Sequence, residues 1–410
     1  MKKVNVEEKI ARNNGTPFYL YSEEKIIKNI SELKNEFNSS DYEILYAMKA
    51  NSNPYIVKLI FSYGIGVDAC SLEEIELALR CNIPSNKIHY NADCLTKSEI
   101  EFAFQKNVNV SIGSLDALDD IDDIDDIDDI DDIEISSLEK SITLRVNTGI
   151  GAGHSSKVIT NGEMSKFGIS PSEINHAQKI CNAKKIKISG LHSHTGSGEM
   201  STKMYIENAE FLMELSIQLD SLSHLNFGGG FGYDYKSYEQ YDLSSIRSSL
   251  DSLRKNFNIS DKTKFLIEPG RFFVANAGRL VAKVSSLKSF GNRNYMGLDT
   301  GYNHFPRCFY YNAWHHIENI SSKEKHIEKY DVVGNLCQSG DVFTRERPLP
   351  KTKKGDLICI NDVGAYGYSM SSNFNLRRRP AEYILDKNGS IIQIRRAENF
   401  EDLFSTSFLD

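Results

Sequence analysis

The sequence predicts an α/β protein whose larger part is a closed (β/α)8 TIM-like barrel, joined to a C-terminal, mostly antiparallel β domain. Three observations predict this fold. Eight short extended runs end between residues 49 and 267, and helical patterns separate most of them. Polar residues cluster where these runs stop. After about residue 276 the extended runs continue without regular helices. Eight alternating strands is the count of a closed barrel rather than an open sheet.

Length and composition fit an ordinary globular protein. The chain has 410 residues, of which 40% are apolar, and can bury a large core in two or three domains. Its net charge of -8 comes from one segment, residues 119–132, which holds ten aspartates. The remainder is slightly positive, so charge gives no reason to expect a nucleic-acid or membrane partner.

Cysteine usage and the amino terminus predict a cytoplasmic protein. The seven cysteines are odd in number and contain no C-x-x-C pair, which argues against a disulfide framework or a zinc ribbon and favours a reducing compartment. Residues 1–9 lack the apolar core of a signal peptide, and no run approaches the roughly 20 apolar residues of a membrane span.

The barrel is expected over residues 25–275. Ser22 caps a first helix that carries apolar residues at helical spacing, and Ser71 and Thr96 each open a capping-box pattern before a later helix. The carboxyl ends of barrel strands face the ligand, so side chains there should converge on one mouth. The eight strand ends are expected near Lys49, Asp68, Asn91, Ile112, Val146, His194, Phe227 and Ile267.

The β domain is expected from residues 1–24 and 276–410. The early run Phe18–Tyr21 can pair with it. Its other strands are expected at Arg279–Lys288, Tyr295–Asp299, Asp331–Leu336, Asp356–Asn361, Ala381–Leu385 and Ile391–Arg395.

A low-complexity insert interrupts the barrel at residues 116–134. Its repeated Ile-Asp-Asp places isoleucines three apart, so they drift around a helix and form no straight stripe. An acidic calcium site is an alternative, but the repeat lacks the turn glycine of an EF-hand loop. Dense like charge instead favours an exposed helix or a partly disordered insertion.

Lys49 is the most informative residue. It ends an apolar run from Tyr42 to Ala50, where a buried cation costs several kcal/mol unless it is paired or neutral. A bond to a carbonyl cofactor would make such a lysine functional. The simpler alternative is that it reaches into water, as most lysines at strand ends do.

Other segments supply what pyridoxal phosphate requires: a phosphate site, a partner for the ring nitrogen and packing for the ring. Gly228, Gly229 and Gly230 follow a strand and offer unhindered backbone N–H groups to a phosphate. Glu268 could hold a protonated ring nitrogen, and Arg271 could lie near the phosphate. An ordinary turn salt bridge is the alternative for this pair.

The segment from Leu191 to Gly198 contains two histidines, His192 and His194, whose spacing of two points them the same way on a strand. That spacing could suggest a metal, but no third ligand lies at a recognisable distance, so no metal is expected. Stacking of one histidine on a ring, with Ser197 donating to the phosphate, fits better. Cys337 could present a thiol to a reacting carbon or could be a small buried hydrophobe.

In order and spacing, these segments resemble the diaminopimelate decarboxylase family of fold-type III, alanine-racemase-like pyridoxal phosphate enzymes. The resemblance extends from Thr16 to Arg378 and implies a decarboxylase of lysine biosynthesis. Further matching segments are Val67–Glu74, Ser165–Ile169 and Gly364–Ser372.

The resemblance implies a role for each site residue. Lys49 would bind the cofactor through an imine, Asp68 would lie beside it, His194 would stack on the ring and Glu268 would bind the ring nitrogen. The phosphate would be held by Ser197, Gly228, Gly229, Gly230, Arg271 and Tyr366.

The resemblance also implies how a small amino-acid substrate is bound. Cys337 would reach in from a neighbouring subunit, so the protein would be a homodimer with shared active sites, and Cys337 or Lys49 would return a proton to the product carbon. The substrate would be bound by Arg271, Arg307, Tyr311, Gln338 and Tyr366.

One departure from the family keeps the substrate open. The family usually has glutamate where this chain has Gln338, and that glutamate pairs with an ammonium of the substrate. Glutamine loses the charge, and a charge-assisted hydrogen bond is about twice as strong as a neutral one. A decarboxylase of a related amino acid or amino-acid conjugate is therefore the alternative, and a non-catalytic pyridoxal phosphate protein is the alternative from another class. A racemase is disfavoured because those enzymes place an arginine at the ring nitrogen.

Overall fold

The computed structural model describes residues 5–121, 140–220, 222–239 and 241–408. The chain divides into two compact units. The barrel unit comprises Ile30–Tyr233 and Gln240–Phe272, and the β unit comprises Met1–Asn29, Asp234–Glu239 and Phe273–Asp410. Each unit is described by itself.

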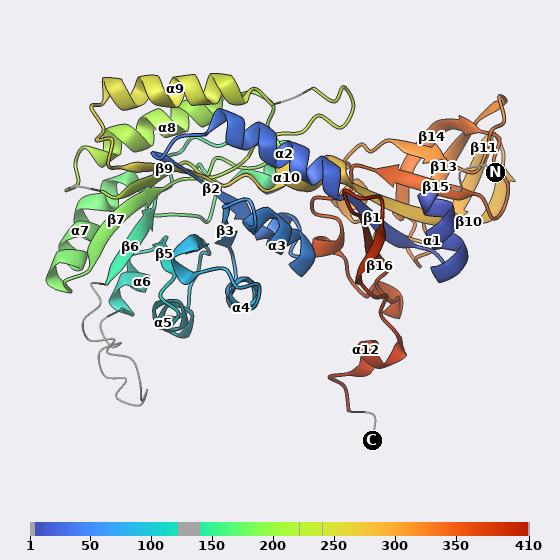
Figure 1. Cartoon of the computed structure of the whole chain (residues 1–410), viewed down its shortest axis with the longest axis horizontal. Coiled ribbons are helices and arrows are strands. Elements are labelled where there is room, and N and C mark those ends of the chain that lie inside the picture. The colour runs from blue at the N-terminus through green and yellow to red at the C-terminus, as the bar shows by residue number, and fades with distance from the viewer. Residues whose placement is uncertain (1–4, 122–139, 221, 240, 409–410) are drawn as a thin grey trace. The chain divides into compact units, whose positions relative to one another are not determined.

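The barrel unit contains the predicted closed barrel (Figure 1). All neighbouring strands pair in parallel, and the last strand pairs with the first, Tyr42 lying opposite Phe265. The strands are β2 (Tyr42–Ala47), β3 (Gly66–Ala69), β4 (Ile88–Tyr90), β5 (Asn109–Ile112), β6 (Ser141–Arg145), β7 (Lys187–His192), β8 (His224–Asn226) and β9 (Lys264–Ile267).

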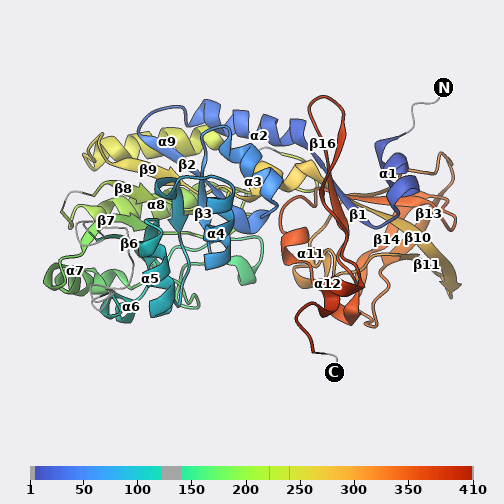
Figure 2. The ribbon, with the colours of Figure 1, turned by 60° about the horizontal axis from the view of Figure 1, so that its bottom comes forward.

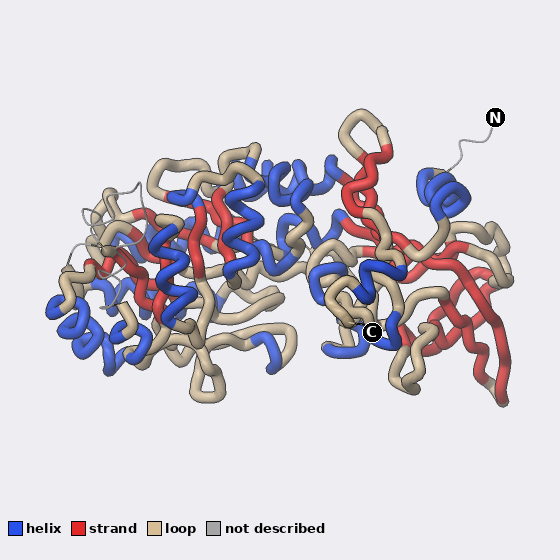
Figure 3. Tube along the Cα trace, turned by 90° about the horizontal axis from the view of Figure 1, so that it is seen from below, coloured by secondary structure: helices blue, strands red, loops and turns tan. Residues whose placement is uncertain are grey.

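Helices follow most of these strands and lie outside them (Figures 2 and 3). The predicted caps are present: the hydroxyl of Ser22 accepts from the Lys25 N–H, and Thr96 forms a reciprocal capping box with Glu99. The helices are α2 (Glu23–Glu36), α3 (Pro54–Phe61), α4 (Leu72–Arg80), α5 (Lys97–Gln105), α6 (Asp116–Asp119), α7 (Ile174–Ala183), α8 (Lys203–Ser216), α9 (Leu243–Asn256) and α10 (Arg271–Val274).

At the start of α4, one of the two hydrogen bonds of the predicted capping box has a different donor. Ser71 accepts from the Glu74 N–H as expected, but the Glu74 carboxylate accepts from the N–H of Cys70 rather than from that of Ser71. The cap therefore also fixes the backbone of Cys70, directly after β3.

Strand burial explains why the barrel sequence looks continuously apolar. In β2 every residue except Glu43 is buried, as expected for parallel strands covered on both faces. Two expected strand ends are wrong by two residues. β2 ends at Ala47, and Lys49 lies in a 3-10 turn (Met48–Ala50); β7 ends at His192, so His194 lies in the following loop. Both side chains are carried on turns beyond the strands.

The β unit is built on a nine-stranded sheet with the order β14-β13-β11-β10-β1-β16-β17, extended by β15 and β12 beside β10. β1 pairs with β10 and β16, which confirms that the early strand joins this sheet. Its strands are β1 (Phe18–Ser22), β10 (Gly278–Phe290), β11 (Arg293–Leu298), β12 (Ile317–Asn319), β13 (Ile327–Val333), β14 (Val342–Pro350), β15 (Leu357–Asn361), β16 (Ala381–Leu385) and β17 (Ile391–Arg395).

Two of these strands, β12 and β14, were not predicted, and β13 begins and ends earlier than the expected Asp331–Leu336. β14 carries prolines and charged residues, and most of its side chains are only partly buried, so it lacks the apolar run used to recognise a strand. The remaining helices of the unit are α1 (Val6–Asn14), α11 (Arg307–Tyr310) and α12 (Phe400–Phe404).

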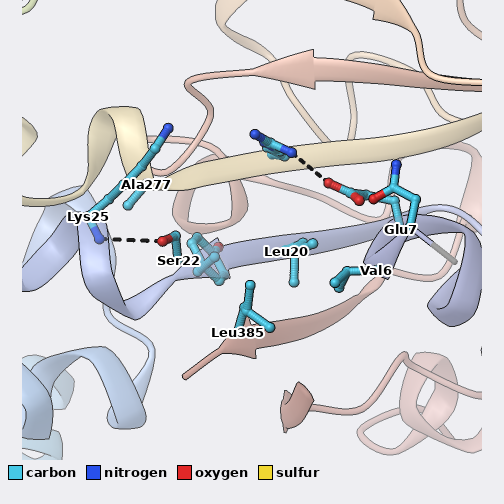
Figure 4. Close-up of a pocket in the computed structure, with 10 residues that line it drawn as sticks. Val6, Glu7, Leu20, Ser22, Lys25, Ala277 and Leu385 are labelled. Atoms are coloured by element: carbon cyan, nitrogen blue, oxygen red, sulfur yellow. Dashed lines mark hydrogen bonds and ion pairs between the residues drawn. The ribbon is translucent and has the colours of Figure 1, made fainter. Parts of the chain in front are cut away.

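The core of the β unit joins segments distant in sequence. Phe18 packs edge-on against Tyr383, and Ile10 of α1 packs with them against Val281. A cavity of about 270 Å³ lies beside this core, lined partly by Leu20 and Leu385 (Figure 4).

The Ile-Asp-Asp repeat lies, from residue 122 on, outside the described residues. Among the described residues, no helix is both long and apolar enough to cross a membrane.

Candidate active site

Lys49 lies at the mouth of the barrel, in the turn after β2. Its Nζ is 2.8 Å from Oδ2 of Asp68 and 3.4 Å from Sγ of Cys70. Asp68, on β3, is fully buried. A buried carboxylate next to an ammonium gives that lysine a fixed position, which a lysine reaching into solvent would not have.

Asn91, directly after β4, connects Asp68 to Glu268. Its Nδ2 donates to Oδ1 of Asp68 at 3.0 Å and to Oε1 of Glu268 at 2.5 Å. These two bonds use both amide hydrogens of Asn91. Burial raises the pKa of Asp68, as does the charge of Glu268, while Lys49 opposes the shift. The side-chain amide of Asn91 thus links the two carboxylates by hydrogen bonds.

Glu268 follows β9 and is the centre of the network. Asn226, the last residue of β8, donates to Oε1 at 2.6 Å, and Nε2 of His192 lies 3.3 Å from Oε2. Burial alone would raise the pKa of Glu268, but His192, Lys49 and Asn226 outweigh burial and lower it. Glu268 is therefore a buried anion.

The glycine loop after β8 joins the same network. The Gly228 N–H donates to Oδ1 of Asn226, and the Gly229 N–H donates to Nδ1 of His194 at 3.2 Å. Among the described residues, the Gly230 N–H has no protein acceptor. Two of the three glycine amides therefore already donate to side chains, so fewer of them can bind a phosphate than the sequence suggested. A Cβ on Gly229 would lie 2.1 Å from the Glu268 carbonyl oxygen, so this position requires glycine.

His194 is half-buried. Burial lowers the pKa of His194, and the cations Lys49 and Arg145 lower it further. Since Nδ1 accepts the Gly229 N–H, the proton of the neutral ring lies on Nε2.

Arg271 and Ser197 form the second polar cluster of the mouth. Nη2 of Arg271 donates to Oγ of Ser197 at 2.9 Å, and Arg271 is 5% exposed. A buried guanidinium beside a hydroxyl and a glycine loop is a donor set suited to an anion.

Sequence reasoning missed three residues of this mouth as site residues: Asn91, Arg145 and Asn226. Arg145 ends β6, is 5% exposed and lies with Cζ 4.3 Å from the centre of the Phe167 ring. The signal that identified Lys49, a lone cation closing an apolar run, is present at Arg145 too. The asparagines carry a weaker signal, because asparagine after a strand is usually a turn residue.

The remaining predicted residues lie in the β unit. Arg307 begins α11, is 2% exposed and donates from Nη1 to the Tyr235 hydroxyl at 2.7 Å, with Cζ 4.8 Å from the centre of that ring. Tyr311 follows α11, and its ring meets that of Tyr310 edge-on. Tyr366 is half-buried and has a positive φ of 56°.

Cys337 and Gln338 are exposed on a loop after β13. The Cys337 N–H donates to Oδ1 of Asn375, and the Tyr302 hydroxyl donates to Oε1 of Gln338 at 2.6 Å. Cys337 is therefore not the buried hydrophobe of the alternative interpretation. All seven cysteines are free thiols.

Comparison with known proteins identifies the family. Residues 23–275 match the model of the pyridoxal-binding domain of pyridoxal-dependent decarboxylases. The diaminopimelate decarboxylase of Methanothermobacter thermautotrophicus is 32% identical over 96% of this chain and 92% of its own, and that of Escherichia coli K12 is 32% identical over 96% and 94%. The chain belongs to the diaminopimelate decarboxylase family.

Solved structures agree with this assignment. The Helicobacter pylori diaminopimelate decarboxylase, in complex with L-lysine, superimposes with a TM-score of 0.89 at 30% identity, covering 97% of this chain and 98% of that one. A lysine/ornithine decarboxylase from Vibrio vulnificus is 22% identical with a TM-score of 0.79, which shows the shared fold. This member of the diaminopimelate decarboxylase family is thus a pyridoxal phosphate-dependent carboxy-lyase, which excludes the non-catalytic alternative.

The barrel mouth fits the cofactor of the family. Lys49, held by Asp68, offers an amine for the cofactor carbonyl. Glu268 offers a carboxylate for the ring nitrogen. Arg271, Ser197 and the Gly230 amide offer donors for the phosphate. The described residues contain no cluster of three or more histidine, cysteine or acidic side chains arranged to hold a metal, and His192 contacts Glu268 instead.

Proposed function

We propose that this protein decarboxylates meso-diaminopimelate to L-lysine and carbon dioxide. The observation that carries the proposal is the continuous network Lys49–Asp68–Asn91–Glu268–Asn226–Gly228. It joins the candidate cofactor lysine to the candidate ring-nitrogen acid and then to the glycine loop. The relatives named diaminopimelate decarboxylase, together with the L-lysine complex of one, support the substrate.

Each part of the network has a task in this proposal. Lys49 would hold the cofactor through its amine. Asp68 would stabilise the lysine whenever it carries a charge, as its contact with Nζ does in this structure. Arg271, Ser197 and the glycine loop hold the phosphate, together with Tyr366, and His194 packs on the ring.

Pyridoxal phosphate, when bound, supplies an electron sink for the pair left on the α-carbon as carbon dioxide departs. The task of Glu268 is to keep a proton on the ring nitrogen, and its lowered pKa suits it, because an anion holds that proton better than a neutral acid.

Arg307, Tyr311, Arg271, Gln338 and Tyr366 bind the substrate in this proposal. Arg307 is already ordered by its bond to Tyr235, so a carboxylate would meet a preformed guanidinium. Cys337 or Lys49 returns the proton to the α-carbon.

The surface around Cys337 supports a homodimer. Three stacked rings, Tyr302, Phe309 and Phe374, lie beside the Cys337 loop; Phe309 is 40% and Phe374 43% exposed, and the nearby Leu376 is 65% exposed. A contiguous apolar surface of this kind is typical of an interface. We propose that a second copy covers it and receives Cys337 into its own site, and that the enzyme works in the cytoplasm, where its thiols stay reduced.

The second candidate is a decarboxylase of a related amino acid or an amino-acid conjugate, and Gln338 favours it. Oε1 of Gln338 already accepts from Tyr302, so the amide presents N–H donors outward. Donors match a distal carbonyl or hydroxyl of a substrate, whereas an ammonium would meet only the remaining lone pair of Oε1, without the charge of a glutamate.

A substrate panel tests the proposal. The protein with pyridoxal phosphate is given meso-diaminopimelate, its stereoisomers, lysine, ornithine and N-acylated diamino acids, and released carbon dioxide is measured. We expect the highest kcat/KM for meso-diaminopimelate. A kcat/KM for an N-acylated diamino acid that is about tenfold or more above that for meso-diaminopimelate would reject the proposal and support the second candidate.

Gln338→Glu separates the two candidates at one residue. If the distal group of the substrate is an ammonium, the substitution should lower KM for meso-diaminopimelate by about tenfold or less, the range of one charge-assisted bond. Tyr302→Phe is the matched control, because it frees Oε1 of Gln338 without adding charge. Weaker binding of meso-diaminopimelate by the Gln338→Glu variant would contradict the first candidate.

A further inference from the structure

Of the two neighbouring histidines His192 and His194, only His194 has a task in the proposed function. It ends β7, is 1% exposed, and both of its ring nitrogens lack a hydrogen-bond partner among the described residues. Buried polar atoms are nearly always hydrogen-bonded, so two unsatisfied nitrogens on one buried ring require an explanation.

The carboxylate of Glu268 shows where Nε2 of His192 is directed. Nε2 of His192 lies 3.3 Å from Oε2 of Glu268, which is within charge-contact distance but lacks the alignment of a hydrogen bond. Asn91 and Asn226 both donate to the other oxygen, Oε1. The structure therefore places His192 against the oxygen, Oε2, to which neither asparagine donates.

We propose that His192 is a positioning residue that donates from Nε2 to Oε2 of Glu268 and so fixes the plane of this carboxylate. The inference rests on the proposed function, in which Glu268 holds the proton of the cofactor ring nitrogen.

Carboxylate geometry gives the reason for a third donor. Two donors on Oε1 fix that oxygen, but the terminal torsion of a glutamate is broad, so Oε2 can still swing about it. A donor on Oε2 removes this freedom. Nε2–H is a donor in the protonated ring and in one neutral tautomer, so the contact does not depend on the charge of His192.

Counting acceptor positions leads to the same conclusion. A carboxylate accepts about four hydrogen bonds. Asn91, Asn226 and His192 take three, which leaves one position, on Oε2, for the ring nitrogen proton. His192 thus determines which position stays open.

The experiment compares two amides at position 192. In His192→Gln the amide nitrogen reaches about as far as Nε2 and keeps a donor to Glu268. In His192→Asn the amide is closer to the place of Nδ1 and does not reach. His224→Asn is the control for a barrel histidine, since His224 is also buried but bonds Thr143 and Ser223.

The readouts are the dissociation constant of pyridoxal phosphate, from titration of the cofactor-free protein, and the absorbance of the bound cofactor against pH. We expect His192→Asn to weaken binding about tenfold or more and to shift the pH profile. His192→Gln and His224→Asn should stay within about threefold of the wild type. An unchanged His192→Asn variant, equal losses in both 192 variants, or the same shift in His224→Asn would overturn the inference.

The assay contains no amino-acid substrate. A different substrate in the panel would therefore reject the proposed reaction without affecting these measurements. A wild-type protein that fails to bind the cofactor would overturn both proposals.

Discussion

The barrel unit and the β unit present their functional side chains in opposite ways. In the barrel unit, Lys49, Asp68, Asn91 and Glu268 are joined by short hydrogen bonds and held from several strand ends. In the β unit, Cys337 and Gln338 lie on an exposed loop. Under the proposed function, the cofactor site is preorganised inside one unit, whereas Cys337 and Gln338 would act only when another surface covers their loop.

Lys49→Ala should give the largest loss on the barrel side. The substitution removes the proposed cofactor-binding amine, so the absorbance band of the covalently bound cofactor should vanish and kcat/KM should fall by at least about a thousandfold, the order seen when a covalent catalytic group is deleted. Absorbance and carbon dioxide release measure the two effects. Lys87→Ala is the control, because Lys87 pairs with Glu43 at the other end of the barrel strands. A band that survives in Lys49→Ala would reject the assignment.

Glu268→Gln should give the next loss, about 100- to 1,000-fold in kcat, the range for removing one preorganised electrostatic group. Glutamine keeps an oxygen for Asn91 and Asn226 but cannot carry the charge that holds the ring proton. Steady-state kinetics with saturating cofactor measures the loss. Activity within fivefold of the wild type would mean that Glu268 has no part in stabilising the reaction.

If Cys337→Ala, like Lys49→Ala, lowers activity strongly, mixing the two variants tests whether the exposed loop completes a second copy. Lys49→Ala and Cys337→Ala lose different parts of the proposed shared site, and a mixed dimer would contain one site with both residues intact. Activity should therefore return when the two variants are unfolded, mixed and refolded together. Each variant refolded alone is the control. Mixed dimers that form but remain inactive would show that Cys337 serves the site of its own chain.

Acid should destabilise the protein, and the barrel unit more than the β unit. Burial lowers the pKa of His89 and His304 to about 4 and that of His224 to about 3. The unfolded chain, with histidine pKa values near 6.5, binds more protons below that pH, so stability falls as pH falls from about 6.5 toward 4. Each neutral histidine contributes about 2 kcal/mol of this loss between pH 7 and 5.

The free energy of unfolding, measured with denaturant at about pH 7 and about pH 5, reports the acid effect. His224→Gln, which cannot be protonated, should lose less stability on acidification than the wild type. A pH-independent free energy of unfolding would contradict the prediction. His89 and His224 belong to the barrel unit and His304 to the β unit, so probes in each unit sharpen the comparison.

The sequence predicted the barrel better than the β sheet for a physical reason. Buried parallel strands such as β2 are uniformly apolar, and capping residues such as Thr96 mark where helices begin. The partly exposed β14 carries no such pattern and was missed. In the candidate site, Lys49 and Glu268 were predicted from the sequence because a charge in an apolar run is conspicuous. Asn91, Asn226 and the task of His192 were not, because their meaning depends on contacts between strands far apart in sequence.

Reduction with borohydride tests the central claim most directly. Borohydride converts the bond between the cofactor and its lysine into a stable amine, and mass spectrometry of the digested protein then locates the modified residue. The account predicts one pyridoxyl phosphate group, on Lys49. A label on any other lysine, or no label on a protein that binds the cofactor, would contradict it.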